Sequence, residues 1–248
     1  MEHTNYYGDL CTEVYEILHP SAPAEEWEFY RSYAKPGDRI LEPLCGSGRF
    51  LIPFLEEGFE IEGVDLSAEM LDALKRKAPA AKALCMDLMD YTPQRLFDYI
   101  FICSGSIGLF TDLSMCRRLL VKLRSMLHPG GRFVFSVDTV DARSPEDADY
   151  CTTARLPASG GTELVLLTKN HYDPQTQTQF SPGIYQRWKD GSLLQTETMD
   201  FQIHLYRPGE MESYLKDAGF SQITTYSSFR KEPVSAQGQE MLLFECTV

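Results

Sequence analysis

The sequence predicts an α/β protein whose doubly wound, mostly parallel sheet of seven strands carries an inserted antiparallel β-meander. Three observations support this fold class. Short apolar segments alternate with helical segments through residues 1–138, the alternation stops in 139–207, and it resumes in 208–248. Apolar strands separated by helices pair in parallel and are covered on both faces. We therefore expect 1–138 and 208–248 to form one domain, with a helical segment at its N-terminus and 139–207 inserted into it.

The first part of the chain contains five strand signals separated by turn and helix signals. Strands are expected at 38–42, 59–65, 81–87, 97–104 and 131–138, and helices at 21–34, 48–58, 67–79 and 112–127. Ser67 is a typical N-cap, and Gly58 and Pro79 end the helices that precede them. The strands end, in order, at Glu42, Asp65, Asp87, Ser104 and Asp138. In an open parallel sheet, ligands bind beside such strand ends.

Residues 139–207 are rich in threonine, glutamine and aromatic side chains, which is typical of exposed antiparallel strands. Strands are expected at 162–168, 177–188 and 193–206, and Asp190-Gly191 predicts a hairpin turn between the last two. We expect this insert to fold as a lid over the strand ends and to bury Tyr172, Phe180, Tyr185 and Trp188. A helix at 209–220 and strands at 221–229 and 240–248 complete the chain.

Composition and charge argue against several classes of protein. The chain has 248 residues, 43% of them hydrophobic, and a net charge of −13. This acidic balance argues against nucleic acid as a partner, because polyphosphate binding relies on basic surface. No segment reaches the ~18 apolar residues of a membrane span, and the N-terminus lacks the basic start and apolar run of a signal peptide.

The seven cysteines show no Cys-x-x-Cys spacing. We therefore expect neither a metal site nor a disulfide framework, and a cytoplasmic location. Cys85 and Cys103 lie inside apolar strand signals, where a thiol is usually buried. The oligomeric state is not predicted by any of these patterns.

The turn after the first strand reads Glu42-Pro43-Leu44-Cys45-Gly46-Ser47-Gly48. A buried strand that ends in a glycine-rich turn is typical of nucleotide-binding α/β domains. Asp65 ends the next strand, where a carboxylate accepts hydrogen bonds from both hydroxyls of a ribose. Beside the Ser67 cap, the same acid also suits a helix N-terminus. A dinucleotide fingerprint would need a third glycine at the position of Leu51.

This turn resembles the first motif of the class I S-adenosylmethionine-dependent methyltransferases, an acid followed by three alternate glycines, with Leu44 in place of the first glycine. Later segments resemble the family's other motifs in the same order: GVDLSAEML from Gly63, CMDLMDY from Cys85, FDYIFICSGSIGLF from Phe97 and LRSMLHPGGRFVFSV from Leu123. The resemblance spans residues 38–138, with a tail at 208–248. It implies a Rossmann-like domain with S-adenosyl-L-methionine as cofactor.

The resemblance also implies which residues bind the cofactor. Glu42 would hold the methionine amino group, Asp65 the ribose and Asp87 the adenine amino group. The backbone at Leu44 and at the two glycines of the turn, Gly46 and Gly48, would pass beneath the cofactor. The other positions carried over from the motifs are Ser47, Arg49, Leu66, Met70, Leu88, Ser104 and Gly105. Core packing is an equal alternative for Leu66, Met70 and Leu88.

Tyr15, with Tyr6 and Tyr7, would lie near the sulfonium, where aromatic rings add cation–π attraction. Packing of these rings against the sheet is an equal alternative.

Methyl transfer from a sulfonium is an in-line displacement whose rate comes largely from alignment of the reacting atoms. A base is needed only when the acceptor must lose a proton, and Asp138 is the candidate. His171 and His204 lie in the insert, where a lone histidine more often packs or is exposed, and His128 belongs to a helix stop.

The segment Cys103-Ser104-Gly105-Ser106 lacks the Asn/Asp-Pro-Pro-aromatic set of amino-directed DNA methyltransferases. We therefore expect a small-molecule acceptor, methylated at N or O, with the insert supplying most of its pocket. Two other functions share much of the pattern: a non-catalytic S-adenosylmethionine-binding protein and an NAD(P)-dependent oxidoreductase. The acid at Glu42 and the absent third glycine weigh against the oxidoreductase.

Overall fold

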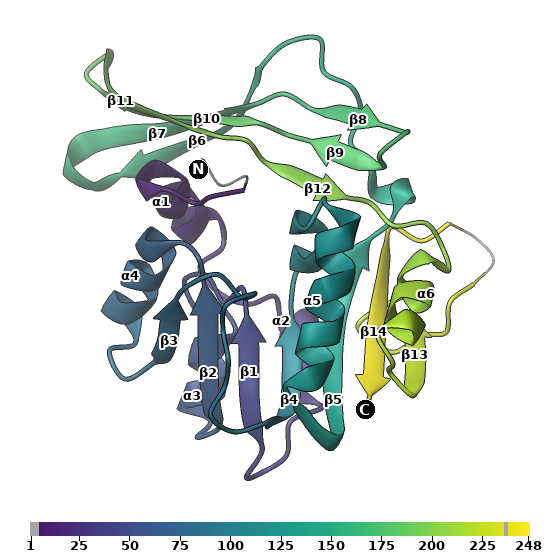
Figure 1. Cartoon of the computed structure of the whole chain (residues 1–248). Coiled ribbons are helices and arrows are strands. Elements are labelled where there is room, and N and C mark those ends of the chain that lie inside the picture. Colours follow the sequence, from purple (N-terminus) through teal and green to yellow (C-terminus); the bar gives the residue numbers. More distant parts are fainter. Residues whose placement is uncertain (1–4, 236–237) are drawn as a thin grey trace.

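The computed structural model describes residues 5–235 and 238–248, so the first four residues of the N-terminal stretch considered above lie outside it. Figure 1 shows a twisted central sheet flanked by helices, with smaller sheets lying across the carboxyl ends of its strands. The central sheet has seven strands in the order β13-β14-β5-β4-β1-β2-β3. They are β1 Arg39–Pro43, β2 Glu60–Asp65, β3 Lys82–Cys85, β4 Phe97–Ile102, β5 Leu127–Asp138, β13 Gln222–Tyr226 and β14 Met241–Thr247. Pairing is parallel except for β14, which is antiparallel to β5 and β13, and the predicted fold class is confirmed.

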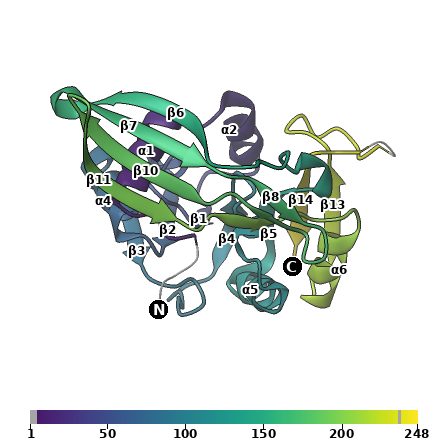
Figure 2. The ribbon, with the colours of Figure 1, turned by 90° about the horizontal axis from the view of Figure 1, so that it is seen from above.

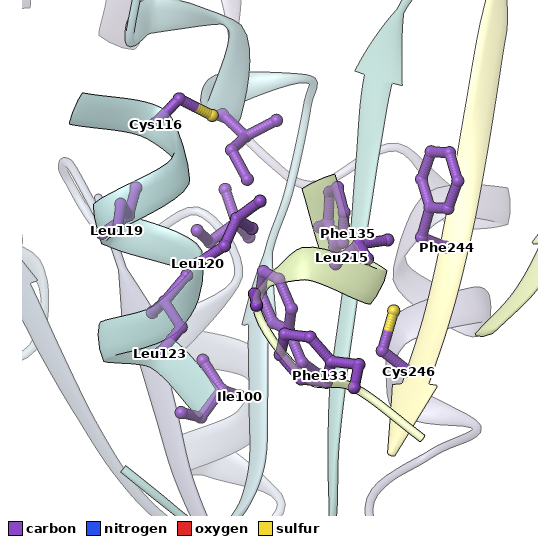
Figure 3. Close-up of a cluster of buried hydrophobic side chains, with 14 of the residues drawn as sticks. Ile100, Cys116, Leu119, Leu120, Leu123, Phe133, Phe135, Leu215, Phe244 and Cys246 are labelled. Carbon is purple, nitrogen blue, oxygen red and sulfur yellow. The ribbon is translucent and has the colours of Figure 1, made fainter. Parts of the chain in front are cut away.

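Helices cover both faces of this sheet. One face packs against α5 (Leu113–Ser125) and α6 (Glu210–Asp217), and the other against α2 (Ala24–Arg31), α3 (Leu51–Glu56) and α4 (Ala68–Lys77). Figure 3 shows Leu120 and Leu123 of α5 beside Phe133 of β5, all fully buried. Burial of each such side chain contributes about 1.5–3 kcal/mol, so the apolar face predicted for α5 holds it on the sheet.

Local signals set the helix ends. The Ser67 side chain accepts a hydrogen bond from the Met70 amide at 3.0 Å, as its predicted N-cap role requires. α3 is shorter than the predicted 48–58, because Gly48 and Gly58 both have left-handed backbone, at φ 82° and 86°. No helix in the described part of the chain combines the length and apolar character of a membrane span.

The insert forms two antiparallel sheets. One has the order β11-β10-β7-β6, from β6 Cys151–Ala158, β7 Thr162–Thr168, β10 Gly183–Lys189 and β11 Ser192–Met199. The other has the order β12-β9-β8, from β8 His171–Asp173, β9 Thr178–Phe180 and β12 Gln202–His204. The hairpin turn predicted at Asp190-Gly191 joins β10 to β11, with φ 48° and 76°. Each of the two long strands predicted here is split, at Ser181-Pro182 and at Asp200-Phe201, because the chain passes from one sheet to the other.

Some expectations about burial were wrong. Of the four aromatic residues of the insert that we expected to be buried, only Tyr185 is, and Tyr172, Phe180 and Trp188 are half-buried. Cys103 is buried as expected, but Cys85 is exposed, because β3 is a four-residue edge strand.

Helix α1 (Asp9–Leu18) lies between the four-stranded sheet and the central domain (Figures 1 and 2). Its buried residues Leu10 and Val14 pack against Leu164 and Leu166 of β7. The Glu197 carboxylate on β11 accepts hydrogen bonds from the α1 amides of Leu10, at 3.0 Å, and Cys11, at 3.1 Å. A carboxylate at a helix N-terminus satisfies free amides and suits the helix dipole. The insert therefore holds α1 by both apolar packing and charge.

A second joint connects the insert to α6 through Glu210. Its carboxylate accepts hydrogen bonds from Gln177 Nε2 at 2.8 Å, Tyr214 Oη at 2.7 Å and the Arg207 amide at 3.0 Å, and His204 Nε2 lies 3.2 Å away. Burial alone would raise the pKa of Glu210, but these hydrogen bonds together lower it to about 2. The folded state therefore favours the ionised carboxylate.

We predict that Glu210→Gln lowers the free energy of unfolding at pH 7 by about 1–3 kcal/mol. The depressed pKa stabilises the fold above the pKa of the unfolded chain, near 4.3, and this stabilisation is lost as the pH falls through about 2. Urea unfolding of both proteins from pH 7 down to pH 2 measures the difference. A difference that did not shrink as the pH fell would contradict the assigned role of the charge.

Candidate active site

A cavity of about 390 Å³ lies at the carboxyl ends of β1, β2 and β4. It brings together most of the predicted site residues: Tyr15, Glu42, Leu44, Gly46, Arg49, Asp65, Leu66, Met70, Asp87 and Ser104 all line it. Tyr6 and Tyr7, considered beside Tyr15, line it too. One cavity thus collects residues from motifs that are spread over the first hundred residues of the chain.

The other predicted residues do not line this cavity, each for a local reason. The Ser47 hydroxyl is turned away to donate a hydrogen bond to Glu16 of α1. Gly48 serves packing, since a Cβ there would lie 2.4 Å from Leu74 Cδ1 of α4. Leu88 is buried in the hydrophobic core that includes the apolar residues of α5. Core packing was the alternative to cofactor contact that we gave for this residue. Gly105 lies against Asp138, and a Cβ at Gly105 would come 3.1 Å from Asp138 Oδ2.

The turn after β1 has an unusual backbone. Leu44 has φ 58°, in the left-handed region that costs a residue with a Cβ about 1–2 kcal/mol. The turn holds it there, because the amides of Leu44 and Cys45 both donate to Val64 O, at 2.7 and 3.3 Å. Leu44 occupies the position of the motif's first glycine, so the chain keeps the glycine-type backbone while adding an apolar side chain to the cavity wall.

Asp65 joins the turn to the end of β2. Its Oδ2 accepts a hydrogen bond from the Gly46 amide at 2.7 Å, and its Oδ1 accepts one from the Ser67 amide at 2.9 Å. Burial raises the pKa of Asp65, and these backbone hydrogen bonds partly oppose that effect. Each carboxylate oxygen retains a lone pair, so Asp65 can hold the turn and accept from a ligand at once.

Opposite charges stand at one end of the cavity, each with an open hydrogen-bonding position. Glu42 Oε2 is buried and has no hydrogen-bond partner among the described residues, and the Cys103 thiol lies 3.7 Å from Oε1. Burial raises the pKa of Glu42 well above its ordinary value. Arg49 Nε is likewise buried without a hydrogen-bond partner in the described chain, while Nη2 donates to the Ser104 hydroxyl. Buried polar atoms of this kind are rare and indicate a ligand or water.

The N-terminal segment closes one side of the cavity. Tyr6 Oη donates to Glu69 Oε2 at 2.7 Å, and the Tyr7 ring meets the Tyr15 ring edge-on, with centroids 5.8 Å apart. Asn5 reaches in the other direction, where its side chain donates to Gln202 O at 2.9 Å and to Leu109 O at 3.2 Å. The segment thus spans the cavity between α4 and the insert.

Several lining residues were not predicted from the sequence. They are Asn5, Cys45, Phe50, Ser67, Met89, Cys103, Ser106, Met115 and the run Leu109–Asp112. Cys45, Phe50, Ser67, Cys103 and Ser106 adjoin motif residues, so their sequence position was a usable signal. Leu109–Asp112 and Met115 reach the cavity because the chain after β4 turns back across it, which no local pattern indicated.

The candidate bases lie elsewhere. Asp138 does not line the cavity, but it adjoins Gly105, between the lining residues Ser104 and Ser106. Its carboxylate makes no hydrogen bond or ion pair with any other described residue, and burial raises its pKa. His171 is exposed and paired with Glu146, and neither it nor His204 lines the cavity.

The insert also departs from expectation. We expected it to supply most of the acceptor pocket, yet no residue of 139–207 is among the described residues that line this cavity. The physical reason is the position of α1 and of residues 5–7, which lie between the insert and the cavity.

Comparison with known proteins agrees with the geometry. The family of methyltransferase domains matches residues 40–131. The Bacillus subtilis (strain 168) protein YqeM, named as a methyltransferase, is 25% identical over 244 residues, which cover 92% of each chain.

Two solved structures share the fold over nearly the whole length. The sugar N-methyltransferase KedS8 from Streptoalloteichus sp ATCC 53650 has a TM-score of 0.75 and 22% identity, covering 100% of this chain and 97% of its own. CalS10, an amino pentose methyltransferase from Micromonospora echinaspora solved with S-adenosylmethionine bound, has a TM-score of 0.69 and 13% identity, covering 100% of both chains. Residues 40–131 thus match a methyltransferase domain, and the chain as a whole has the fold of S-adenosylmethionine-dependent methyltransferases.

Proposed function

We propose that the protein transfers the methyl group of S-adenosylmethionine to an amine nitrogen of a small-molecule acceptor, and that the cavity at the ends of β1, β2 and β4 binds the cofactor. One observation carries the placement of the cofactor. A buried carboxylate and a half-buried guanidinium, each with one buried atom that has no partner among the described residues, line the same cavity as an acid at the end of β2. This set matches an amino acid zwitterion joined to a ribose.

The binding roles follow from charge and position. Glu42 would accept from the cofactor's ammonium group, and Arg49 would donate to its carboxylate, so that the buried atoms Glu42 Oε2 and Arg49 Nε each gain a partner. Asp65 would accept from the ribose hydroxyls, and Asp87 would accept from the adenine amino group. Leu66 and Met70 would pack beside the sugar and the adenine.

Bound S-adenosylmethionine supplies a methyl group on a positively charged sulfur. The task of the chain is then to hold an acceptor in line with that methyl group, exclude water and take up one proton if the amine arrives protonated. Tyr7 and Tyr15 would place aromatic rings near the positive charge. Asp138 would receive the proton, because its carboxylate is unpartnered in the described chain and its raised pKa brings it nearer to that of an amine.

Nitrogen is favoured over oxygen by the acidic surroundings. Glu42, Asp65, Asp87 and Asp112 line the cavity, and such a site attracts a cationic amine more strongly than a neutral alcohol. The names of KedS8 and CalS10, a sugar N-methyltransferase and an amino pentose methyltransferase, support an amino sugar or a similar small polar amine.

Residues 1–138 and 208–248 would then form the cofactor-binding domain, and 139–207 a lid that acts through α1. The contacts of Glu197 and β7 with α1 support this division, because they hold α1 between the insert and the cavity that residues 5–7 also line. All seven cysteines are free, which supports a reducing compartment such as the cytoplasm.

We predict that Asp65→Ala weakens binding of S-adenosylhomocysteine about tenfold or more. Two hydrogen bonds to the ribose are lost, at roughly 0.5–1.5 kcal/mol each, and the Gly46 amide loses its acceptor as well. Calorimetric titration measures the dissociation constant. Asp65→Asn is the matched variant, because its amide oxygen still accepts one of these bonds, and its loss should be smaller. An unchanged dissociation constant in Asp65→Ala would rule out the ribose assignment.

We predict that Glu197→Ala weakens S-adenosylhomocysteine binding about three- to tenfold. Loss of a helix cap costs about 1 kcal/mol, and α1 carries Tyr15 into the cavity. Glu163→Ala, on the same sheet but exposed, is the control and should bind like the wild type. Equal affinity in the wild type and Glu197→Ala would show that the insert does not act through α1.

The choice of nitrogen is tested by a screen of paired acceptors, each amino sugar beside the sugar that carries a hydroxyl instead. Release of S-adenosylhomocysteine with the amines and not with their alcohol counterparts is the expected result. Methylation of the alcohols would contradict the proposal.

With the best amine, Asp138→Asn should lower kcat about 100-fold while the dissociation constant of S-adenosylhomocysteine stays within twofold. A wild-type kcat in this variant would exclude Asp138 as the base.

A further inference from the structure

Glu26 lies outside every motif, on the first turn of α2, yet it is buried with 5% of its surface exposed. Its Oε1 accepts a hydrogen bond from the Ser104 amide at 2.7 Å and lies 3.2 Å from the Ser104 hydroxyl. No ion pair involves Glu26 within the described chain. A buried carboxylate is costly unless it is well partnered, so a carboxylate held by a single residue calls for a functional explanation.

Ser104 is the residue that Glu26 holds, and it has a special backbone. It lies at the end of β4 with φ 54°, in the left-handed region that disfavours a residue with a Cβ. The Glu26 carboxylate satisfies its amide in that conformation. The Ser104 hydroxyl also accepts a hydrogen bond from Arg49 Nη2, so it joins the guanidinium to the carboxylate.

The chain of contacts runs from α2 through β4 to the turn after β1. Ser104 and Arg49 line the cavity, whereas Glu26 does not. Arg49 is held through Nη2, and its Nε is the buried atom without a partner among the described residues. Glu26 therefore fixes both the Ser104 turn and the direction of the guanidinium without touching the cavity.

We propose that Glu26 is a positioning residue for the amino acid end of the cofactor, acting through Ser104 to orient Arg49. This inference rests on the placement of the cofactor proposed above. It distinguishes two halves of the ligand, because Arg49 would contact the carboxylate and no part of the adenosine. S-adenosylhomocysteine carries both halves, whereas 5′-methylthioadenosine has the same adenine and ribose and lacks the amino acid.

The test compares the affinities of these two ligands in Glu26→Gln, which keeps the shape of the side chain and removes its charge. We expect the dissociation constant of S-adenosylhomocysteine to rise about tenfold and that of 5′-methylthioadenosine to stay within twofold. Glu28→Gln, exposed on the same helix, is the matched control and should change neither. Equal weakening of both ligands would show a merely structural role, and no weakening would show no role, so either result overturns the inference.

A second variant keeps the inference testable if Glu26→Gln folds poorly. Ser104→Gly removes the hydroxyl that joins the two charges, while glycine adopts the same left-handed backbone without strain. It should also weaken S-adenosylhomocysteine selectively, and the double variant should be no weaker than the worse single variant by more than about twofold. Additive losses would contradict the connection through Ser104. If the wild type bound neither ligand, the proposed cofactor site itself would be wrong. If the wild type bound both ligands and the variants bound them equally well, only the role of Glu26 would be wrong.

Discussion

The hydrogen bond from the Gly46 amide to the Asp65 carboxylate is the contact on which the rest of the site depends. It joins the ends of β1 and β2, whose parallel register sets Glu42 beside Gly63 and Pro43 beside Val64. The two strands can approach this closely because Gly63 has no Cβ. A Cβ at this position would lie only 2.5 Å from Cys45 Sγ. With this contact in place, the turn exposes its backbone, and Glu42, Arg49 and Asp65 face one cavity.

Burial then gives the site its chemical character. Desolvation raises the pKa of both Glu42 and Asp65, so the cavity is lined by carboxyl groups that gain from a cationic partner. A ligand with one ammonium and one carboxylate group relieves the Glu42 and Arg49 charges together. Polar atoms that lack partners in the free protein cost free energy. A bound zwitterion removes this cost, so the site selects for it.

Features encoded by neighbouring residues could be predicted from the sequence. The Ser67 cap, the Asp190-Gly191 hairpin and the acids Asp65 and Asp138 at the ends of β2 and β5 depend on spacings of a few residues, and the structure shows each of them. Asp87 instead follows β3, which ends at Cys85. Contacts between distant segments could not be predicted. Glu26 finds Ser104 78 residues away, Glu197 caps α1 across 187 residues, and Asn5 meets Gln202 across 197. The same limit explains why the position of α1 between the insert and the cavity could not be predicted, because it depends on such long-range contacts.

The most direct test of this account is a crystal structure of the protein with S-adenosylhomocysteine. We expect the ligand in the cavity at the ends of β1, β2 and β4. Its ribose hydroxyls should lie within hydrogen-bond distance of Asp65, its ammonium group by Glu42 and its carboxylate by Arg49. A ligand bound elsewhere, or one whose amino acid end leaves Glu42 Oε2 and Arg49 Nε without partners, would contradict it.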